Sequence, residues 1–242
     1  KSWKLGAKLG AGACGEVFAA TLHSPEGNGA SDNGLWVAKV AQLPPAKIGN
    51  GKAKKSEAEK AANALYGEHT LYRGHLHQFK YAPSLPEHGG FGNCDGLRFL
   101  IMQRMRIDLE QLPAEAGAGG GLASLPLARV CALGKLVLEA LRCLHTERSY
   151  AFVDMKPENI MLGPRRHSGA DRGDGDVYLV DFALAKRFVD SAGRHVAFVA
   201  GGQQCDGTPE YMSLSCHSGG SAGRRDDIEA LGYILMHLVA GE

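Results

Sequence analysis

The apolar residues of this chain change their spacing near residue 102, and this change constrains the fold more than any other feature. Before it, apolar residues alternate or form short runs, as in strands, whereas after residue 106 they recur every three or four positions, as in helices. The change falls in the run RFLIMQRM at 98–105. We therefore expect an α+β protein of two lobes, with strands and one helix in residues 1–102 and mainly helices in residues 106–242.

The N-terminal part is predicted to begin as a meander of strands. Residues 5–22 alternate and turn on glycine, and the apolar run LWVAKV at 35–40 has the composition of a buried strand. Between them, residues 24–34 are rich in glycine and polar side chains, which predicts a loop.

A single helix is predicted after this meander. Ser56 and Glu59 form a Ser-x-x-Glu capping box, which marks the start of a helix, and we expect the lysines at 47–55 to be a solvated lead-in. Leu65, Glu68 and Tyr72 follow at spacings of three and four residues, so they share one helical face. A carboxylate on a buried face requires a cationic partner.

The C-terminal part is predicted to be built on two long helices. The first, at 126–146, begins near Pro126 and carries an apolar stripe of Val130, Leu133, Val137, Leu141 and Leu144. The second, from 224 onward, has so few polar positions that we expect it to be buried almost all round. Between them, the apolar runs at 160–162 and 177–180 are predicted to pair as strands, and the glycine-rich segment 115–121 resembles a linker.

Composition excludes several classes of protein. With 27 Lys+Arg against 26 Asp+Glu, the net charge of +1 provides no chain-wide attraction for nucleic acid. The longest apolar stretch, Leu231 to Ala240, is about half of what a membrane span requires, so no membrane partner is expected. Six cysteines without a Cys-x-x-Cys pair predict a reduced, intracellular protein, cytoplasmic or nuclear, and no leader follows Lys1. His75 and His77 lack the further ligands of a metal site.

A glycine-rich segment near the N-terminus has the pattern of a phosphate-covering loop. Gly10, Gly12 and Gly15 are followed by Val17, and glycines without Cβ atoms allow backbone N–H groups to approach phosphate oxygens. Such a triple arises by chance in a glycine-rich chain, so its context decides. That context is Lys39 on the next strand, after Ala38, with Glu68 available to hold the lysine in place.

The segment 154–159 and the downstream Asp181 carry the strongest chemical signal. Asp154 is predicted to take the proton of an attacking hydroxyl, and Lys156 to neutralise the phosphoryl group in transit. Asn159 and Asp181 are predicted to hold the divalent ions that bridge phosphates. These four residues, in complementary roles, predict phosphoryl transfer.

The chain at this point resembles the eukaryotic protein kinases of the casein kinase one and vaccinia-related kinase group. The resemblance rests on Gly207-Thr208-Pro209-Glu210-Tyr211, on the segment from Arg224 to Tyr233 and on DVYLVDFALAKRF. The vaccinia-related branch is favoured because LVDFALAKRF, GRHV and CDGTPEYMSLSCHSG resemble its segments best. It implies a single kinase domain in 1–242, with residues 103–105 joining the lobes. It also implies an ATP- and Mg²⁺-dependent serine/threonine kinase acting on protein substrates, with acidic proteins as a candidate class. The nucleotide is expected between the lobes.

The same resemblance assigns roles to further residues. Met102 is the expected gatekeeper, and Gln103 to Met105 the hinge that reads adenine. Thr208 is expected to contact Asp154 and Lys156, and Asp227 to anchor the catalytic loop.

The chain departs from the kinase pattern at three places. Phe152 and Val153 replace the His-Arg of His-Arg-Asp, while Phe152 can still pack on Phe182 and Tyr72. Ala183 replaces the glycine of Asp-Phe-Gly, at a cost of ~1 kcal/mol where a positive φ is needed. The chain also stops where the family continues with more helices, so the C-terminal lobe is expected to be partial. A pseudokinase, acting as a nucleotide-binding or scaffold module, therefore remains the alternative to an active enzyme.

Overall fold

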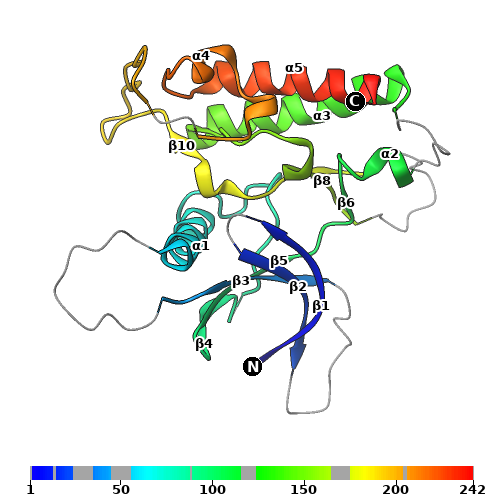
Figure 1. The fold of residues 1–242 in the computed structure, drawn as a ribbon, viewed down its shortest axis with the longest axis vertical. Helices are drawn as coiled ribbons and strands as arrows, with labels where there is room; N and C mark the ends of the chain where they lie inside the picture. The colour runs from blue at the N-terminus through cyan, green and yellow to red at the C-terminus, as the bar shows by residue number, and fades with distance from the viewer. Residues whose placement is uncertain are drawn as a thin grey trace. The chain divides into compact units, whose positions relative to one another are not determined.

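The computed structural model describes residues 2–12, 15–23, 35–44, 56–87, 89–115, 124–164, 175–203 and 206–241. The chain forms two compact units, one of Lys1–Phe79 with Pro83–Arg104 and one of Lys80–Ala82 with Met105–Glu242. Strands dominate the first unit and helices the second, which confirms the predicted α+β class (Figure 1).

An antiparallel sheet of five strands forms the N-terminal unit, in the order β1-β2-β3-β5-β4. Its strands are β1 (Ser2–Gly12), β2 (Gly15–His23), β3 (Trp36–Gln42), β4 (Phe91–Cys94) and β5 (Leu97–Gln103). Ala20, Ala38, Val40 and Ile101 make its buried centre, and Trp3, Phe18 and Trp36 pack around it. The predicted meander and the predicted strand at 98–105 are therefore both present.

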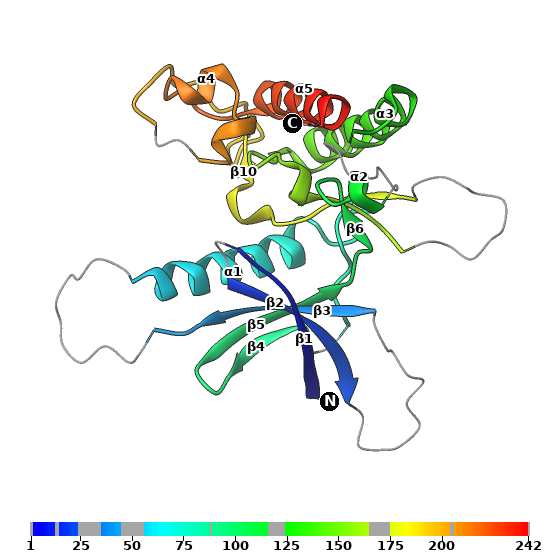
Figure 2. The same cartoon turned by 45° about the vertical axis from the view of Figure 1, so that its right-hand side comes forward.

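Helix α1 (Glu57–Gly74) lies against β3 and β5 of this sheet (Figure 2). The predicted cap is present, because the Ser56 Oγ accepts a hydrogen bond from the Glu59 N–H at 3.1 Å. The predicted face is buried as well, with Leu65, Glu68 and Tyr72 at 3% exposure or less.

The described residues of the C-terminal unit form four α-helices and several short strands. Its helices are α2 (Leu112–Glu115), α3 (Leu127–Cys143), α4 (Leu214–His217) and α5 (Arg224–Ala240), and a π-helical turn (Leu144–Arg148) continues α3. Strands β6 (Ile107–Asp108), β8 (Ile160–Leu162) and β9 (Val177–Leu179) form one small sheet, and β7 (Tyr150–Ala151) pairs with β10 (Lys186–Arg187). Short 3₁₀ turns lie at Pro157–Asn159, Phe182–Leu184 and Pro209–Tyr211.

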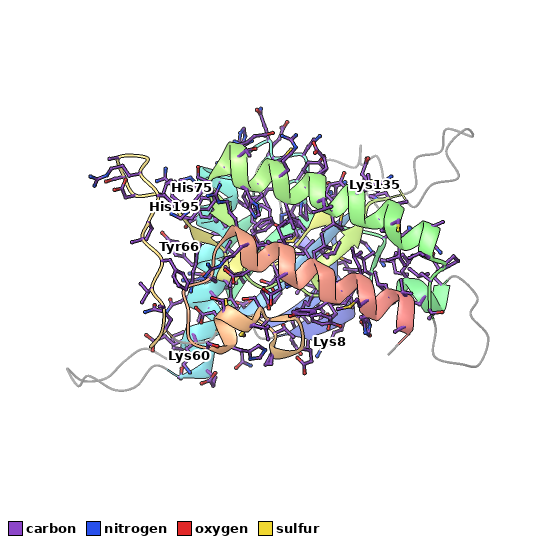
Figure 3. All side chains as sticks on the ribbon, turned by 90° about the horizontal axis from the view of Figure 1, so that it is seen from above. Lys8, Lys60, Tyr66, His75, Lys135 and His195 are labelled. Atoms are coloured by element: carbon purple, nitrogen blue, oxygen red, sulfur yellow. The ribbon has the colours of Figure 1, made fainter. Side chains whose placement is uncertain are left out.

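Helices α3 and α5 lie side by side, as Figures 1 and 3 both show. A Cβ at Gly134 of α3 would lie only 3.0 Å from the Leu235 Cδ1 of α5, so the two helices approach closely there. The predicted apolar stripe of α3 is fully buried. Pro126 occupies the N-cap position, one residue before the helical turn in which it was expected.

The expectation that α5 is buried all round was wrong. Ala230, Leu231, Ile234 and Leu238 are buried, whereas Ile228, Met236 and Val239 are 40–60% exposed. Low polarity along a helix predicts burial only where a neighbour covers each side. In the described part of the chain, the neighbouring helix α3 lies along one side of α5.

Some sequence-based expectations fall on residues outside the described ranges. These are the loop at 24–34, the lysines at 47–55 and most of the segment 115–121. Among the described residues, no helix combines the length and apolar character that crossing a bilayer requires. The four described cysteines, Cys94, Cys131, Cys143 and Cys216, form no disulfide.

Replacing Gly15 with alanine should destabilise the N-terminal sheet. Gly15 has φ +121°, and a Cβ there would lie 2.2 Å from the backbone oxygen of Val40 on β3. We expect Gly15→Ala to lower the free energy of unfolding by about 2–4 kcal/mol, measured by thermal melting. Gly6→Ala is the matched control, since its nearest contact is an ordinary 3.4 Å to the Ala19 Cβ. Equal melting temperatures for the two variants would contradict this account.

Candidate functional site

The three glycines of the predicted phosphate loop differ in whether the fold requires glycine at their positions. They lie at the end of β1 and the start of β2, where Gly10 pairs with Val17 and Gly12 with Gly15. Gly15 is required by its positive φ and by its approach to β3. No described atom lies within 4 Å of a Cβ built at Gly10 or Gly12, and neither has a positive φ. The fold therefore accounts for one glycine, and the other two leave bare backbone at the surface.

Lys39 and Glu68 form the ion pair that the sequence predicts. The Lys39 Nζ lies 2.8 Å and 3.0 Å from the two carboxylate oxygens of Glu68. The Glu68 side chain is fully buried and that of Lys39 is 14% exposed. Burial of this carboxylate is tolerated because the ammonium group compensates its charge. The pair links β3 to α1, and Val17 stands beside Lys39 in the sheet register.

In the segment expected to read adenine, some backbone N–H groups already donate hydrogen bonds to other parts of the protein. The Gln103 N–H donates to the Ser84 carbonyl at 2.8 Å, and the Arg104 N–H donates to the Leu35 carbonyl at 2.7 Å. The Gln103 side chain is held too, because its Oε1 accepts from the Ser84 Oγ at 3.1 Å. Ala38 and Met102 are buried on the neighbouring strands. Two of the three N–H groups in 103–105 are thus committed within the N-terminal unit.

Asp154 is the centre of a hydrogen-bonded group in the C-terminal unit. Its Oδ1 accepts from the Thr208 Oγ1 at 2.9 Å, and its Oδ2 accepts from the Asn159 Nδ2 at 3.0 Å. The Lys156 Nζ lies 3.5 Å from Oδ2. Sequence reasoning placed these four residues in one site, and the structure brings all four together around one carboxylate.

The β8–β9 pair places Asn159 and Asp181 at the same end of a small sheet. Ile160 pairs with Leu179, so Asn159 just precedes β8 where Asp181 follows β9. The Val180 N–H also donates to the Asn159 carbonyl at 3.0 Å. Asp181 itself adopts the left-handed conformation, with φ 64°. Such strain in a residue other than glycine is maintained only where its surroundings hold it.

The loop before Asp154 contains a strained turn. The Asp154 N–H donates to the Phe152 carbonyl at 3.0 Å, and Val153 between them has φ 74°. This is the γ-turn with positive φ, which is rare and especially unfavourable for a β-branched residue. The turn supplies the bend that leads directly into Asp154.

Asp227 of α5 holds this strained turn, as the sequence predicts. Its carboxylate accepts from the Phe152 and Val153 N–H groups, both at 2.8 Å. Sequence reasoning missed a third partner, His145, whose Nε2 lies 2.8 Å from the Asp227 Oδ2. The signal was available, because His145 follows Leu141 by four residues and so continues the buried stripe of α3. A histidine on such a stripe needs a buried polar partner.

Two of the three departures from the kinase pattern fit locally. Phe152 and Phe182 are buried and pack edge to face, with ring centroids 5.1 Å apart, as predicted. Ala183 lies in a 3₁₀ turn and is not among the described residues with positive φ. The backbone cost expected for an alanine at this position therefore does not arise.

Comparison with known proteins identifies the family. The sequence profile of the protein kinase domain matches residues 100–242, more than half of the chain. The chain belongs to the protein kinase family. It is similar to a probable casein kinase I homolog of Encephalitozoon cuniculi, with 28% identity over 93% of this chain and 63% of that protein. It is also similar to human serine/threonine-protein kinase VRK2, with 31% identity over 60% of this chain and 26% of that protein.

These relatives confirm the predicted group of kinases. One is a casein kinase I homolog and the other a vaccinia-related kinase, and the chain spans less than two thirds of the length of each. The two-lobed kinase fold class expected from the sequence is confirmed as well.

Replacing Asp227 with alanine should destabilise this kinase domain strongly. The change leaves the buried Phe152 N–H, the partly buried Val153 N–H and the His145 ring without their acceptor, at a strained turn. We expect a loss of about 3 kcal/mol or more in the free energy of unfolding, measured by urea denaturation.

Asp190→Ala is the control for this experiment. Asp190 also accepts three hydrogen bonds, from the N–H groups of Ala192 and Arg194 and from the Arg194 side chain, but at the surface. Its loss should be much smaller, because water replaces the lost partners. Comparable losses for the two variants would show that burial of Asp227 is not what matters.

Proposed function

We propose that this protein kinase is an ATP-dependent serine/threonine kinase that transfers the γ-phosphoryl group to hydroxyl groups of protein substrates. The observation that carries the proposal is the arrangement around Asp154. One carboxylate is held by Thr208, Asn159 and Lys156, which supply a hydroxyl, an amide and an ammonium group. This combination suits a group that orients a substrate hydroxyl beside a cation.

Each member of the group has a distinct role in this proposal. Asp154 orients the attacking hydroxyl and accepts its proton as the new oxygen–phosphorus bond forms and the bond to the leaving diphosphate breaks. Lys156 offsets the negative charge of the phosphoryl group in transit. Thr208 fixes the rotamer of Asp154 by donating to the Oδ1, which leaves the carboxylate oriented before substrate arrives.

Nucleotide binding is assigned to residues of both units. Gly10, Gly12 and Gly15, with Val17, are proposed to cover the phosphates, and the bare surface at the first two supports this. Lys39, oriented by Glu68, is proposed to contact the phosphates. Ala38 and Met102 would line the adenine site beside the Gln103 backbone. Because the N–H groups of 103 and 104 already have acceptors, we assign the adenine-reading donor to Met105.

The residues available for magnesium fit that ion. The Asn159 Nδ2 donates to the backbone carbonyl and to the carboxylate of Asp154. This orientation presents the Asn159 amide oxygen as a ligand. Asp181 adds a carboxylate at the same end of the β8–β9 pair. Amide and carboxylate oxygens are ligands that magnesium accepts. Magnesium bound there with the nucleotide would neutralise phosphate charge.

A groove in the C-terminal unit supports protein substrates with acidic segments. A cavity of about 400 Å³ is lined by residues 186–188, 195–199, 203 and 206, by Cys216 and residues 220–223, and by the first three residues of α5. Arg224 lies over the Phe188 ring at 4.6 Å and Arg225 over the Phe198 ring at 4.2 Å, which orients both guanidinium groups. The lining cations are Lys186, Arg187, Arg224 and Arg225, against the carboxylates Asp206 and Asp226. This excess of positive charge favours an acidic peptide.

A pseudokinase is the second candidate function. It is favoured by Val153 and Phe152, which lack the polar groups of the kinase pattern at these two positions. It is disfavoured by the retention of Lys39, Glu68 and the complete group around Asp154.

Two isosteric variants should separate metal binding from phosphoryl transfer. Asp181→Asn removes the charge of a metal ligand, so we expect it to weaken MgATP binding and abolish transfer. Asp154→Asn removes the proton acceptor, so we expect transfer to fall by about 10²-fold or more with MgATP affinity nearly unchanged. The measurements are transfer of labelled phosphate to an acidic protein and calorimetric titration with MgATP. Binding of MgATP by the unaltered chain without any transfer would establish the pseudokinase instead.

Activity should not depend on phosphorylation of the segment between Asp181 and Thr208. Its single hydroxyl side chain is Ser191, and the arginine that would receive a phosphate is replaced by Val153. Lys186 is already paired with Asp206 at 2.6 Å. We expect Ser191→Ala and phosphatase treatment each to leave the rate of labelled phosphate transfer within about twofold. A loss of activity after either treatment would show that a phosphate switch exists.

A further inference from the structure

The side of α1 that faces β4 and β5 carries a contact that the roles proposed above do not use. Ala62, Tyr66 and His69 follow one another at spacings of four and three residues, so they form a row beside the buried row that contains Glu68. Arg98 of β5 lies against this row, together with Phe91 of β4. We call this cluster the Arg98 latch; it consists of Arg98, of Ala62, Tyr66 and His69 on α1, and of Phe91 and Asn93 on β4.

Arg98 connects three elements through its guanidinium group. Its terminal nitrogen donates to the Ala62 carbonyl of α1 at 2.8 Å, and its Nε donates to the Asn93 Oδ1 of β4 at 3.1 Å. Ala62 is buried at 1% exposure and lies within the second turn of α1. A charged donor to a buried carbonyl is a strong hydrogen bond, because water competes weakly for either group.

Aromatic rings reinforce this connection. The guanidinium carbon lies 5.6 Å from the ring centroid of Tyr66 and 5.9 Å from that of Phe91. His69 stacks on the same Phe91, with ring centroids 4.0 Å apart and an angle of 6° between planes. Burial, assisted by the nearby charge of Arg73, lowers the pKa of His69, which favours the neutral ring in this stack. Lys60 and Tyr66 mark α1 in Figure 3.

The latch is a second polar attachment of the helix that carries Glu68, besides the apolar packing of that helix on the sheet. The first is the ion pair between Glu68 and Lys39 of β3. Ala62 and Glu68 are six residues apart, which is about 9 Å along a helix at 1.5 Å per residue. Polar contacts to two neighbouring strands, added to the apolar packing of α1 on the sheet, hold the angle of the helix and its position along the sheet more tightly than one polar contact.

We propose that Arg98 is a positioning residue for phosphoryl transfer, because it holds α1 where Glu68 can orient Lys39. This inference rests on the proposed kinase function. It predicts that Arg98 and Glu68 are energetically coupled through helix α1, on which Arg98 binds the Ala62 carbonyl and which carries Glu68.

A double-mutant cycle tests this coupling. We expect Arg98→Gln to lower kcat on the order of tenfold, the size expected when one charge-assisted hydrogen bond is lost, with KM for the protein substrate unchanged. In a Glu68→Gln background the same replacement should change kcat by less than about twofold, because the pair it positions is already broken. Lys60→Gln is the matched control: Lys60 is a cation on α1 itself, and among the described residues its ammonium group pairs with the exposed Glu57 of the same helix.

Amide hydrogen exchange tests the latch without requiring activity. Arg98→Gln should increase deuterium uptake in residues 62–72 of α1, whereas Lys60→Gln should not. If the unaltered chain transfers no phosphate, the kinase proposal fails, and this measurement, with the affinity for MgATP, still decides whether Arg98 positions α1.

Three results would overturn the inference. They are an equal fall in kcat in both backgrounds, a fully folded Arg98→Gln variant with unaltered kcat, and unaltered exchange in α1. Should Arg98→Gln be too unstable to purify, Arg98→Lys replaces it, since lysine keeps the charge and a donor but not the planar fork. The same changes are then expected with smaller size, and additivity with Glu68→Gln would again contradict the inference.

Discussion

The buried carboxylate of Asp227 supports the backbone from which Asp154 projects. Val153 adopts a positive φ that a β-branched residue avoids, and the turn persists because Asp227 accepts from both N–H groups that the turn presents. His145 completes the shell of this carboxylate. The position of the proposed proton acceptor, which lies in a loop, thus depends on an aspartate of helix α5, distant in the sequence. Loss of that support would release strain at the residue next to Asp154.

The two units each contain a charged pair or group held by well-formed secondary structure. In the N-terminal unit, Lys39 projects from a central strand and Glu68 from the helix packed on it. In the C-terminal unit, the β8–β9 pair aligns the segments that carry Asn159 and Asp181. Phosphoryl transfer requires mainly positioning and charge neutralisation, and both depend on groups that are fixed before the substrate binds. Side chains on regular elements meet that requirement better than side chains on long loops.

The departures from the kinase pattern differ in their physical meaning. Phe152 keeps an apolar contact with Phe182, and Ala183 adopts an ordinary backbone conformation, so neither disrupts its surroundings. Val153 is different, because it stands where the kinase pattern has a cation and itself adopts a strained backbone conformation. The turn before Asp154 is therefore held in place by Asp227, although the charge of the arginine in the kinase pattern is absent. This distinction separates a kinase without a phosphate switch, the function proposed for this chain, from one whose site has collapsed.

Much of this protein could be predicted from its sequence, because the relevant signals are local. The cap at Ser56, the buried stripe of α3 and the strands at 160–162 and 177–179 depend on spacings within one segment. The Lys39–Glu68 pair was also predictable, since a carboxylate on a buried helical face needs a cation. What only the tertiary structure decided depends on neighbours distant in sequence: the exposed side of α5, the acceptor for His145, and the contact of Arg98 with the Ala62 carbonyl. The spacing of side chains along one segment predicts which residues are buried. Which residue each of them contacts is decided by how separate elements pack together.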